Sequence, residues 1–97
     1  MVIGACKIKL HLPENHSLKG KRHVLKSIIA RVRNEFNVAI AETDSQDLWQ
    51  MAELGVCCVS NESRHANEML SKVVDYIANT RLDIQMVDYE VELVECL

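Results

Sequence analysis

Apolar and polar residues alternate over the first twelve positions of the chain. Small or apolar side chains occupy the even positions from Val2 to Leu12, whereas Lys7, Lys9 and His11 lie at odd positions. A period of two is typical of a strand with one buried face. The pattern therefore predicts a first strand that ends before the Pro-Glu-Asn-His sequence that follows it.

The period then changes to about 3.6 residues, which is typical of a helix. Ser17 is a favourable N-cap residue, and a helix is predicted over residues 18–35. A second helix is predicted after a cap at Ser60 or Asn61. The apolar positions of the first helix are Leu18, Leu25, Ile28, Ile29, Val32 and Phe36, and those of the second are Ala66, Met69, Leu70, Val73, Val74 and Ile77.

Three further strands are predicted between and after the helices. Residues 36–43 alternate Val38 and Ile40 with small residues, and residues 48–59 form a long, mostly apolar segment. The polar turn at 44–47 separates these two strands. In the last segment Val87, Tyr89, Val91 and Leu93 are expected to point inward, and Met86, Asp88, Glu90 and Glu92 outward.

The predicted order of elements is β-α-β-β-α-β. This is the split-βαβ, ferredoxin-like plan of an α+β domain, in which right-handed crossovers place both helices on one face of a four-stranded antiparallel sheet. The expected strand order is 4-1-3-2. A single domain over residues 1–97 is expected, because this length suffices for one core and not for two.

Composition adds a charge asymmetry to this picture. Hydrophobic residues are 48% and charged residues 26%, which is ordinary for a globular chain and excludes a disordered tail. The net charge of −3 combines eight cations and one acid in residues 1–34 with three cations and thirteen acids in residues 35–97. No apolar run is long enough to span a membrane, and no signal peptide is recognised, so a cytoplasmic location is expected.

The cysteines and the polar turn are weak candidates for chemistry. Cys6, Cys57, Cys58 and Cys96 contain no C-x-x-C pair, so packing thiols are expected rather than a disulfide or zinc framework. The turn with Asp44 and Asp47 could form an acid–base or metal pocket with His11, His16 or Glu42. Asp and Ser side chains also stabilise turns through local hydrogen bonds to the backbone, and no phosphate-cradling glycine loop occurs. We therefore expect no catalytic residues, metal or cofactor.

The first helix carries the main candidate binding surface. In a helical projection its cations gather opposite the apolar residues. Cations in the first turns oppose the helix dipole, and a polyanion would relieve their mutual repulsion by releasing counterions. The predicted phosphate-binding residues are Lys19, Lys21, Arg22, His23, Lys26 and Arg33, and the basic side is flanked by Lys21 and Arg31. The alternatives are a solvated face, an acidic protein partner, or a small-anion site at the helix N-terminus near Ser17.

The uncovered face of the sheet is a second candidate surface. About half of it is apolar, which usually marks an interface on a small protein, and we predict a sheet-to-sheet homodimer. The predicted interface residues are Ile3, Ala39, Ala41, Trp49, Met51 and Val59. RNA-base stacking on this face is an alternative, for which Trp49 is the only aromatic candidate.

Several motifs resemble those of a known family. They are His16-Ser17-Leu18-Lys19-Gly20-Lys21-Arg22, Asp44-x-Gln46-Asp47-Leu48-Trp49-Gln50, Val59-Ser60-Asn61 and Asp88-Tyr89-Glu90. Together they are similar to the YlxP-like family of small bacterial proteins (domain of unknown function 503). The resemblance implies a ferredoxin-like fold, a cytoplasmic bacterial protein and no established catalytic residues. It also implies a ribosome-related role, because genes of the family often lie near those of translation initiation factor 2 and ribosome-binding factor A.

These observations together predict a non-catalytic protein. We expect it to dock on ribosomal RNA, or on a ribosome-assembly or initiation factor, through the basic side of the first helix. The alternative is a homo-oligomeric regulator that binds a small anion at the N-terminus of that helix.

Overall fold

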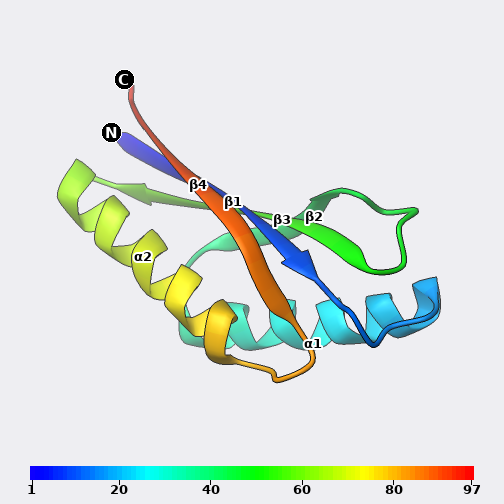
Figure 1. The fold of residues 1–97 in the computed structure, drawn as a ribbon. Helices are drawn as coiled ribbons and strands as arrows, with labels where there is room; N and C mark the ends of the chain where they lie inside the picture. Colours follow the sequence, from blue (N-terminus) through cyan, green and yellow to red (C-terminus); the bar gives the residue numbers. More distant parts are fainter.

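The computed structural model describes all 97 residues and contains six regular elements. They are β1 (Val2–His11), α1 (Leu18–Glu35), β2 (Ala39–Asp44), β3 (Met51–Ser60), α2 (Ser63–Asn79) and β4 (Gln85–Glu95). The strands form one antiparallel sheet in the order β2-β3-β1-β4, and both helices pack against the same face of it (Figure 1). The predicted α+β, ferredoxin-like fold and the 4-1-3-2 strand order are confirmed.

The core lies between the helices and the two central strands. The even positions of β1 are buried, and Ile8 and Leu10 are completely inaccessible to solvent. Antiparallel pairing places Ile8 opposite Leu54 of β3, so both strands present their apolar row to the helices. The predicted cap of α1 is also confirmed, because Ser17 Oγ accepts a hydrogen bond from the backbone N–H of Gly20 at 2.9 Å. Neither α1 nor α2 has the length and hydrophobicity of a membrane-spanning helix.

The second helix begins later than predicted. Its N-cap is Glu62, not Ser60 or Asn61. Ser60 is the last residue of β3, and its hydroxyl accepts a hydrogen bond from the Glu62 N–H at 3.1 Å. The serine therefore stabilises the turn between strand and helix and does not cap the helix itself.

The middle strands are shorter and shifted relative to the prediction. The strands predicted over 36–43 and 48–59 are observed at 39–44 and 51–60. Leu48 and Trp49 consequently lie in the connecting loop. The backbone reverses at Ser45, whose φ of 65° is positive, and Asp44 Oδ1 accepts the Ser45 N–H at 2.8 Å. This local bond is the turn chemistry that the Asp-Ser sequence predicts.

The last strand differs most from its predicted burial. A register shift after Lys9 places Met86, not Val87, opposite the buried Leu10, so the outward prediction for Met86 is wrong. The inward prediction holds for the half-buried Val91, whereas Val87, Tyr89 and Leu93 are 58%, 51% and 38% exposed. Two physical reasons apply: the register shift leaves Val87 without a partner in β1, and β4 is an edge strand, where side chains on the helix side have neighbours on one flank only.

Candidate nucleic-acid interface

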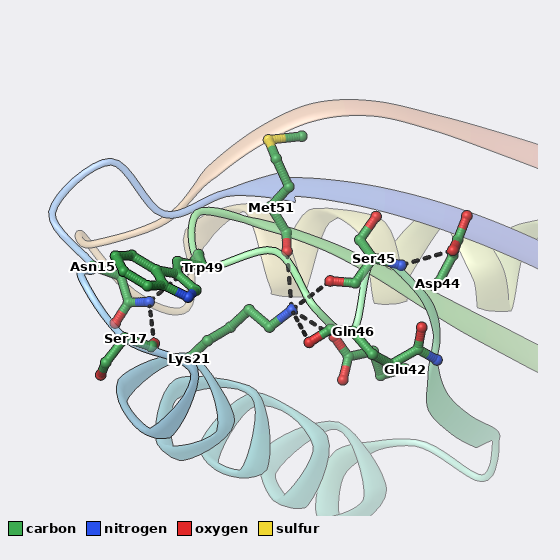
Figure 2. Close-up of polar contacts among 9 residues, drawn as sticks. All are labelled: Asn15, Ser17, Lys21, Glu42, Asp44, Ser45, Gln46, Trp49 and Met51. Carbon is green, nitrogen blue, oxygen red and sulfur yellow. Dashed lines mark hydrogen bonds and ion pairs between the residues drawn. The ribbon is translucent and has the colours of Figure 1, made fainter.

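Lys21 is the one charged side chain in the core, with an exposed fraction of 1%. Its Nζ donates to the backbone carbonyl oxygens of Ser45 (2.7 Å), Met51 (3.2 Å) and Gln46 (3.3 Å), and lies 3.0 Å from Glu42 Oε2 (Figure 2). The three N–H groups thus meet three carbonyls, and the carboxylate supplies the opposite charge. Lys21 cannot reach a phosphate in solvent, so its predicted role in phosphate binding is wrong.

The sequence contained the signal for this burial. Lys21 lies three residues after Leu18, four before Leu25 and seven before Ile28. That spacing places it at the centre of the apolar side of α1, not at the margin of the basic side. A lysine at such a position needs a polar cage, which the loop between β2 and β3 provides.

A second set of hydrogen bonds fixes Trp49 beside the start of α1. Asn15 Nδ2 donates to the carbonyl oxygens of Ser17 (2.7 Å) and Trp49 (2.6 Å) (Figure 2). Gln50 Nε2 donates to the carbonyl oxygens of Pro13 (3.2 Å) and Asn15 (3.1 Å). The loop that precedes α1 and the loop that precedes β3 are therefore joined through side-chain amides.

These side-chain amide hydrogen bonds, called the loop clamp below, require a small residue in the first turn of α1. A Cβ atom on Gly20 would overlap Asn15 Oδ1, so glycine at this position permits the close approach of the loop. Trp49 is 55% exposed and lies off the sheet, beside the N-cap of α1. Its predicted place on the open sheet face is wrong.

Four exposed cationic or titratable side chains gather on the solvent side of the first half of α1. These residues, called the basic face below, are Lys19, Arg22, His23 and Lys26. The four ion pairs of the structure all involve other cations, and the first turn of α1 contains no acid. The basic face spans about 10 Å along the helix, and none of its side chains forms an ion pair.

The other two arginines of α1 have structural partners. Arg33 is exposed on the same side as predicted, and its guanidinium donates to the carbonyl of Ile40 in β2 at 3.2 Å. Arg31 donates to the carbonyl and hydroxyl of Thr80 at 3.1 and 3.3 Å. Arg33 therefore retains only part of its hydrogen-bonding capacity for an external phosphate.

The small-anion alternative loses two of its groups in this geometry. Ser17 Oγ already accepts the Gly20 N–H, and Lys21 is enclosed by the loop carbonyls. Only Lys19 and Arg22 of the predicted set remain accessible near the helix N-terminus. A compact anion pocket is therefore less well supported than an extended anion along the helix.

Five of the six predicted interface residues lie on the open face of the sheet. Cross-strand pairs place Ile3 opposite Val59 and Ala39 opposite Cys57. Ala39 and Ala41 line a shallow hollow of about 850 Å³. The five residues are Ile3, Ala39, Ala41, Met51 and Val59.

The homodimer stays a prediction. Sedimentation should show a dimer for the wild type and a monomer of unchanged melting temperature for Val59→Glu, because Val59 is exposed and a buried unpaired carboxylate is costly at an interface. A wild type that sediments as a monomer at high concentration would contradict it.

The cysteines divide by strand face as the alternation predicts. Cys6 and Cys58 are buried and Cys57 is exposed. Burial raises the pKa of the Cys6 thiol to about 11 and also raises that of Cys58. No cluster of three His, Cys, Asp or Glu side chains has the geometry of a metal site.

The Cys6 thiol should make stability depend on alkaline pH. Its pKa is 9.0 without burial and about 11 in the fold, so between these values the folded state binds more protons. The free energy of unfolding should therefore fall as the pH rises from 9 to 11, by up to ~1.4 kcal/mol per pH unit from this group. Urea unfolding in reductant at pH 8 and 10.5 should show a smaller fall for Cys6→Ala. An identical fall in both proteins would contradict the assignment.

Comparison with known proteins places the chain in a family. A family model described as "Protein of unknown function (DUF503)" matches residues 3–91. "Uncharacterized protein YlxP" of Bacillus subtilis (strain 168) is 38% identical over 76 residues, which cover 78% of this chain and 83% of that protein. The "De novo designed protein Foldit4" is similar over 100% of both chains with a TM-score of 0.54 and 11% identity, which supports the fold alone. In agreement with the resemblance of its motifs, the chain belongs to the DUF503 family.

Proposed function

We propose that this protein is a non-catalytic RNA-binding protein that holds a phosphate backbone on the basic face of α1. The observation that carries the proposal is the group Lys19, Arg22, His23 and Lys26, exposed together and without an acidic partner. Unpaired cations in the first turns of a helix are unfavourable in isolation. Phosphates would relieve this repulsion, and the release of their counterions would drive binding.

Trp49 favours an RNA with an unpaired nucleotide at this site. The indole is exposed beside Ser17, where α1 begins. Aromatic side chains next to a cationic track stack on splayed bases in many RNA-binding proteins, whereas bases within a duplex are not available. The loop clamp through Asn15 holds the Trp49 backbone in place before the RNA arrives, which lowers the ordering cost of binding.

A ribosomal partner fits this chemistry. Ribosomal RNA presents loops and bulges next to structured phosphate backbones, and the YlxP-like resemblance implies a ribosome-related role. The proposed partner is therefore ribosomal RNA or an RNA-containing assembly intermediate, in the cytoplasm.

Trp49 is the single tryptophan of the chain, so its fluorescence reports directly on this site. Titration with a 12-nucleotide single-stranded RNA should change the emission saturably, and a duplex of the same length should produce a smaller change. Trp49→Ala should weaken single-strand binding by about 1–3 kcal/mol, the value of one stacked base, and Trp49→Phe by less. Affinities of the variants can be measured by anisotropy of labelled RNA.

The control is Tyr89→Ala, which removes an exposed aromatic residue at the far edge of the sheet. It should bind RNA like the wild type. Unchanged affinity in Trp49→Ala would exclude stacking by Trp49, and absence of binding by the wild type at low salt would contradict the proposed function itself.

A further inference from the structure

The outer edge of β4 has a row of backbone groups that the fold leaves unpaired. Cys96 and Met1 exchange both of their backbone hydrogen bonds, at 2.8 and 2.7 Å. In an antiparallel ladder such pairs alternate with pairs that make no mutual bonds, and the register is regular from here to the Lys9 pair. The N–H and C=O groups of Val91 and Leu93 therefore point away from β1. No side chain of the protein bonds to either residue.

The side chains along this edge form two rows of different chemistry. On the open face of the sheet, Asp88, Glu90 and Glu92 are all exposed. On the helix side, Tyr89 and Leu93 are 51% and 38% exposed and lie on either side of the half-buried Val91. An acidic row and an apolar row thus flank one line of free backbone groups.

Strand β1, the inner neighbour of β4, shows which side chains pair favourably with the acidic row and with the apolar row. In β1, Lys7 lies opposite Glu90 with 3.8 Å between the charged groups. Ile8 lies opposite Tyr89 on the other face. A basic and apolar alternation therefore fits the inner side of β4, and the acids have no corresponding cation on the outer side.

We propose that the outer edge of β4 docks an extended segment of a partner protein in which Lys or Arg alternates with apolar residues. The segment would add a fifth strand to the sheet. Its backbone would bond to Val91 and Leu93, its cations would face Glu90 and Glu92, and its apolar side chains would cover Tyr89 and Leu93. In strand addition of this kind, backbone hydrogen bonds provide the affinity and alternate side chains provide the specificity. The proposal does not depend on RNA binding by α1.

A second copy of the chain is a poor occupant of this edge. Antiparallel pairing of two β4 strands about a two-fold axis keeps the same face of each sheet on the same side. Asp88, Glu90 and Glu92 of one copy would then oppose the same acids of the other, and like charges directly opposite are destabilising. Strand β2, at the opposite edge of the sheet, is a poorer docking site for an added strand, because it has only six residues and an irregular register.

A designed peptide can stand in for the partner segment. The probe is a fluorescent heptapeptide with valines at odd positions and lysines at even positions. Its control has the same composition with the lysines contiguous. The wild type should bind the alternating peptide at least tenfold more tightly, and hydrogen exchange of the Val91 and Leu93 amides should slow on binding.

Charge reversal on the acidic row supplies the matched variants. Glu92→Lys removes an acid that has no ion-pair partner and should weaken binding of the alternating peptide roughly fivefold. Asp75→Lys makes the same change in net charge on the exposed side of α2 and should leave binding unchanged. Equal binding of both peptides, equal affinity in Glu92→Lys, or strong protection of the two amides in the free protein would each overturn the proposal.

Discussion

Replacement of Lys21 by methionine is expected to lower the free energy of unfolding by about 3–5 kcal/mol, the usual cost of breaking a buried ion pair from one side. Methionine fills a similar volume but donates no hydrogen bond. Three carbonyls of the β2–β3 loop would lose their donor, and Glu42 Oε2 would lose its only polar partner. For a domain of this size the melting temperature should fall by roughly 15–30 °C. Thermal unfolding followed by circular dichroism measures the effect.

Two further variants distinguish the stability that the buried cage contributes from the effects of lost charge and of altered helix propensity. Lys26→Met makes the same substitution at an exposed position of α1 and should change stability by less than about 0.5 kcal/mol. The double variant Lys21→Met with Glu42→Gln should lose less than the two single losses added together, because it leaves no uncompensated charge. Equal melting temperatures for Lys21→Met and the wild type would show that the cage contributes nothing.

The second large effect is expected in RNA affinity. Replacement of Lys19, Arg22 and Lys26 by glutamine removes three charges of the basic face and leaves its backbone and apolar contacts intact. Each phosphate contact contributes about 0.7–0.9 to the dependence of log affinity on log salt. At 0.1 M salt, three lost contacts should therefore weaken binding roughly a hundredfold. The loss should be similar for different sequences, since phosphate contacts position an RNA without reading it.

The matched control is the triple variant of Lys9, Arg64 and Lys72 to glutamine. It changes the net charge by the same amount at exposed positions outside α1. It should retain affinity within a few fold of the wild type, because these side chains lie outside the basic face and salt weakens interactions between separated exposed charges. An equal loss in both triple variants would mean that overall charge, not the basic face, determines RNA binding.

Periodicity was sufficient to predict the fold. The alternation in β1 and the three-and-four spacing in α1 each correspond to one buried face, and chain order then leaves few topologies. The prediction that Lys21 binds phosphate was wrong because it followed the charge of the side chain and not its position in the helical projection. An angular criterion alone would have placed it in the core.

The positions of Trp49 and of the β4 side chains depend on tertiary contacts. Trp49 lies near the start of the apolar segment 48–59, which was predicted to be a strand, but the strand begins only at Met51. The hydrogen bonds from Asn15 and Lys21 that hold the preceding loop connect residues about 30 positions apart, so no local pattern reveals them. Burial in β4 likewise depends on its place at the sheet edge and on the register shift near Val87.

The most direct test of phosphate binding by α1 is the salt dependence of RNA affinity in the wild type and in the Lys19, Arg22 and Lys26 triple variant. Anisotropy of a labelled single-stranded RNA, recorded between 50 and 300 mM salt, yields the slope of log affinity against log salt. Three to four contacts predict a slope of about −2 to −3 for the wild type, and the triple variant, which keeps at most one contact, should show a slope between zero and about −0.7. A wild-type slope near zero, or the same slope in both proteins, would contradict the account.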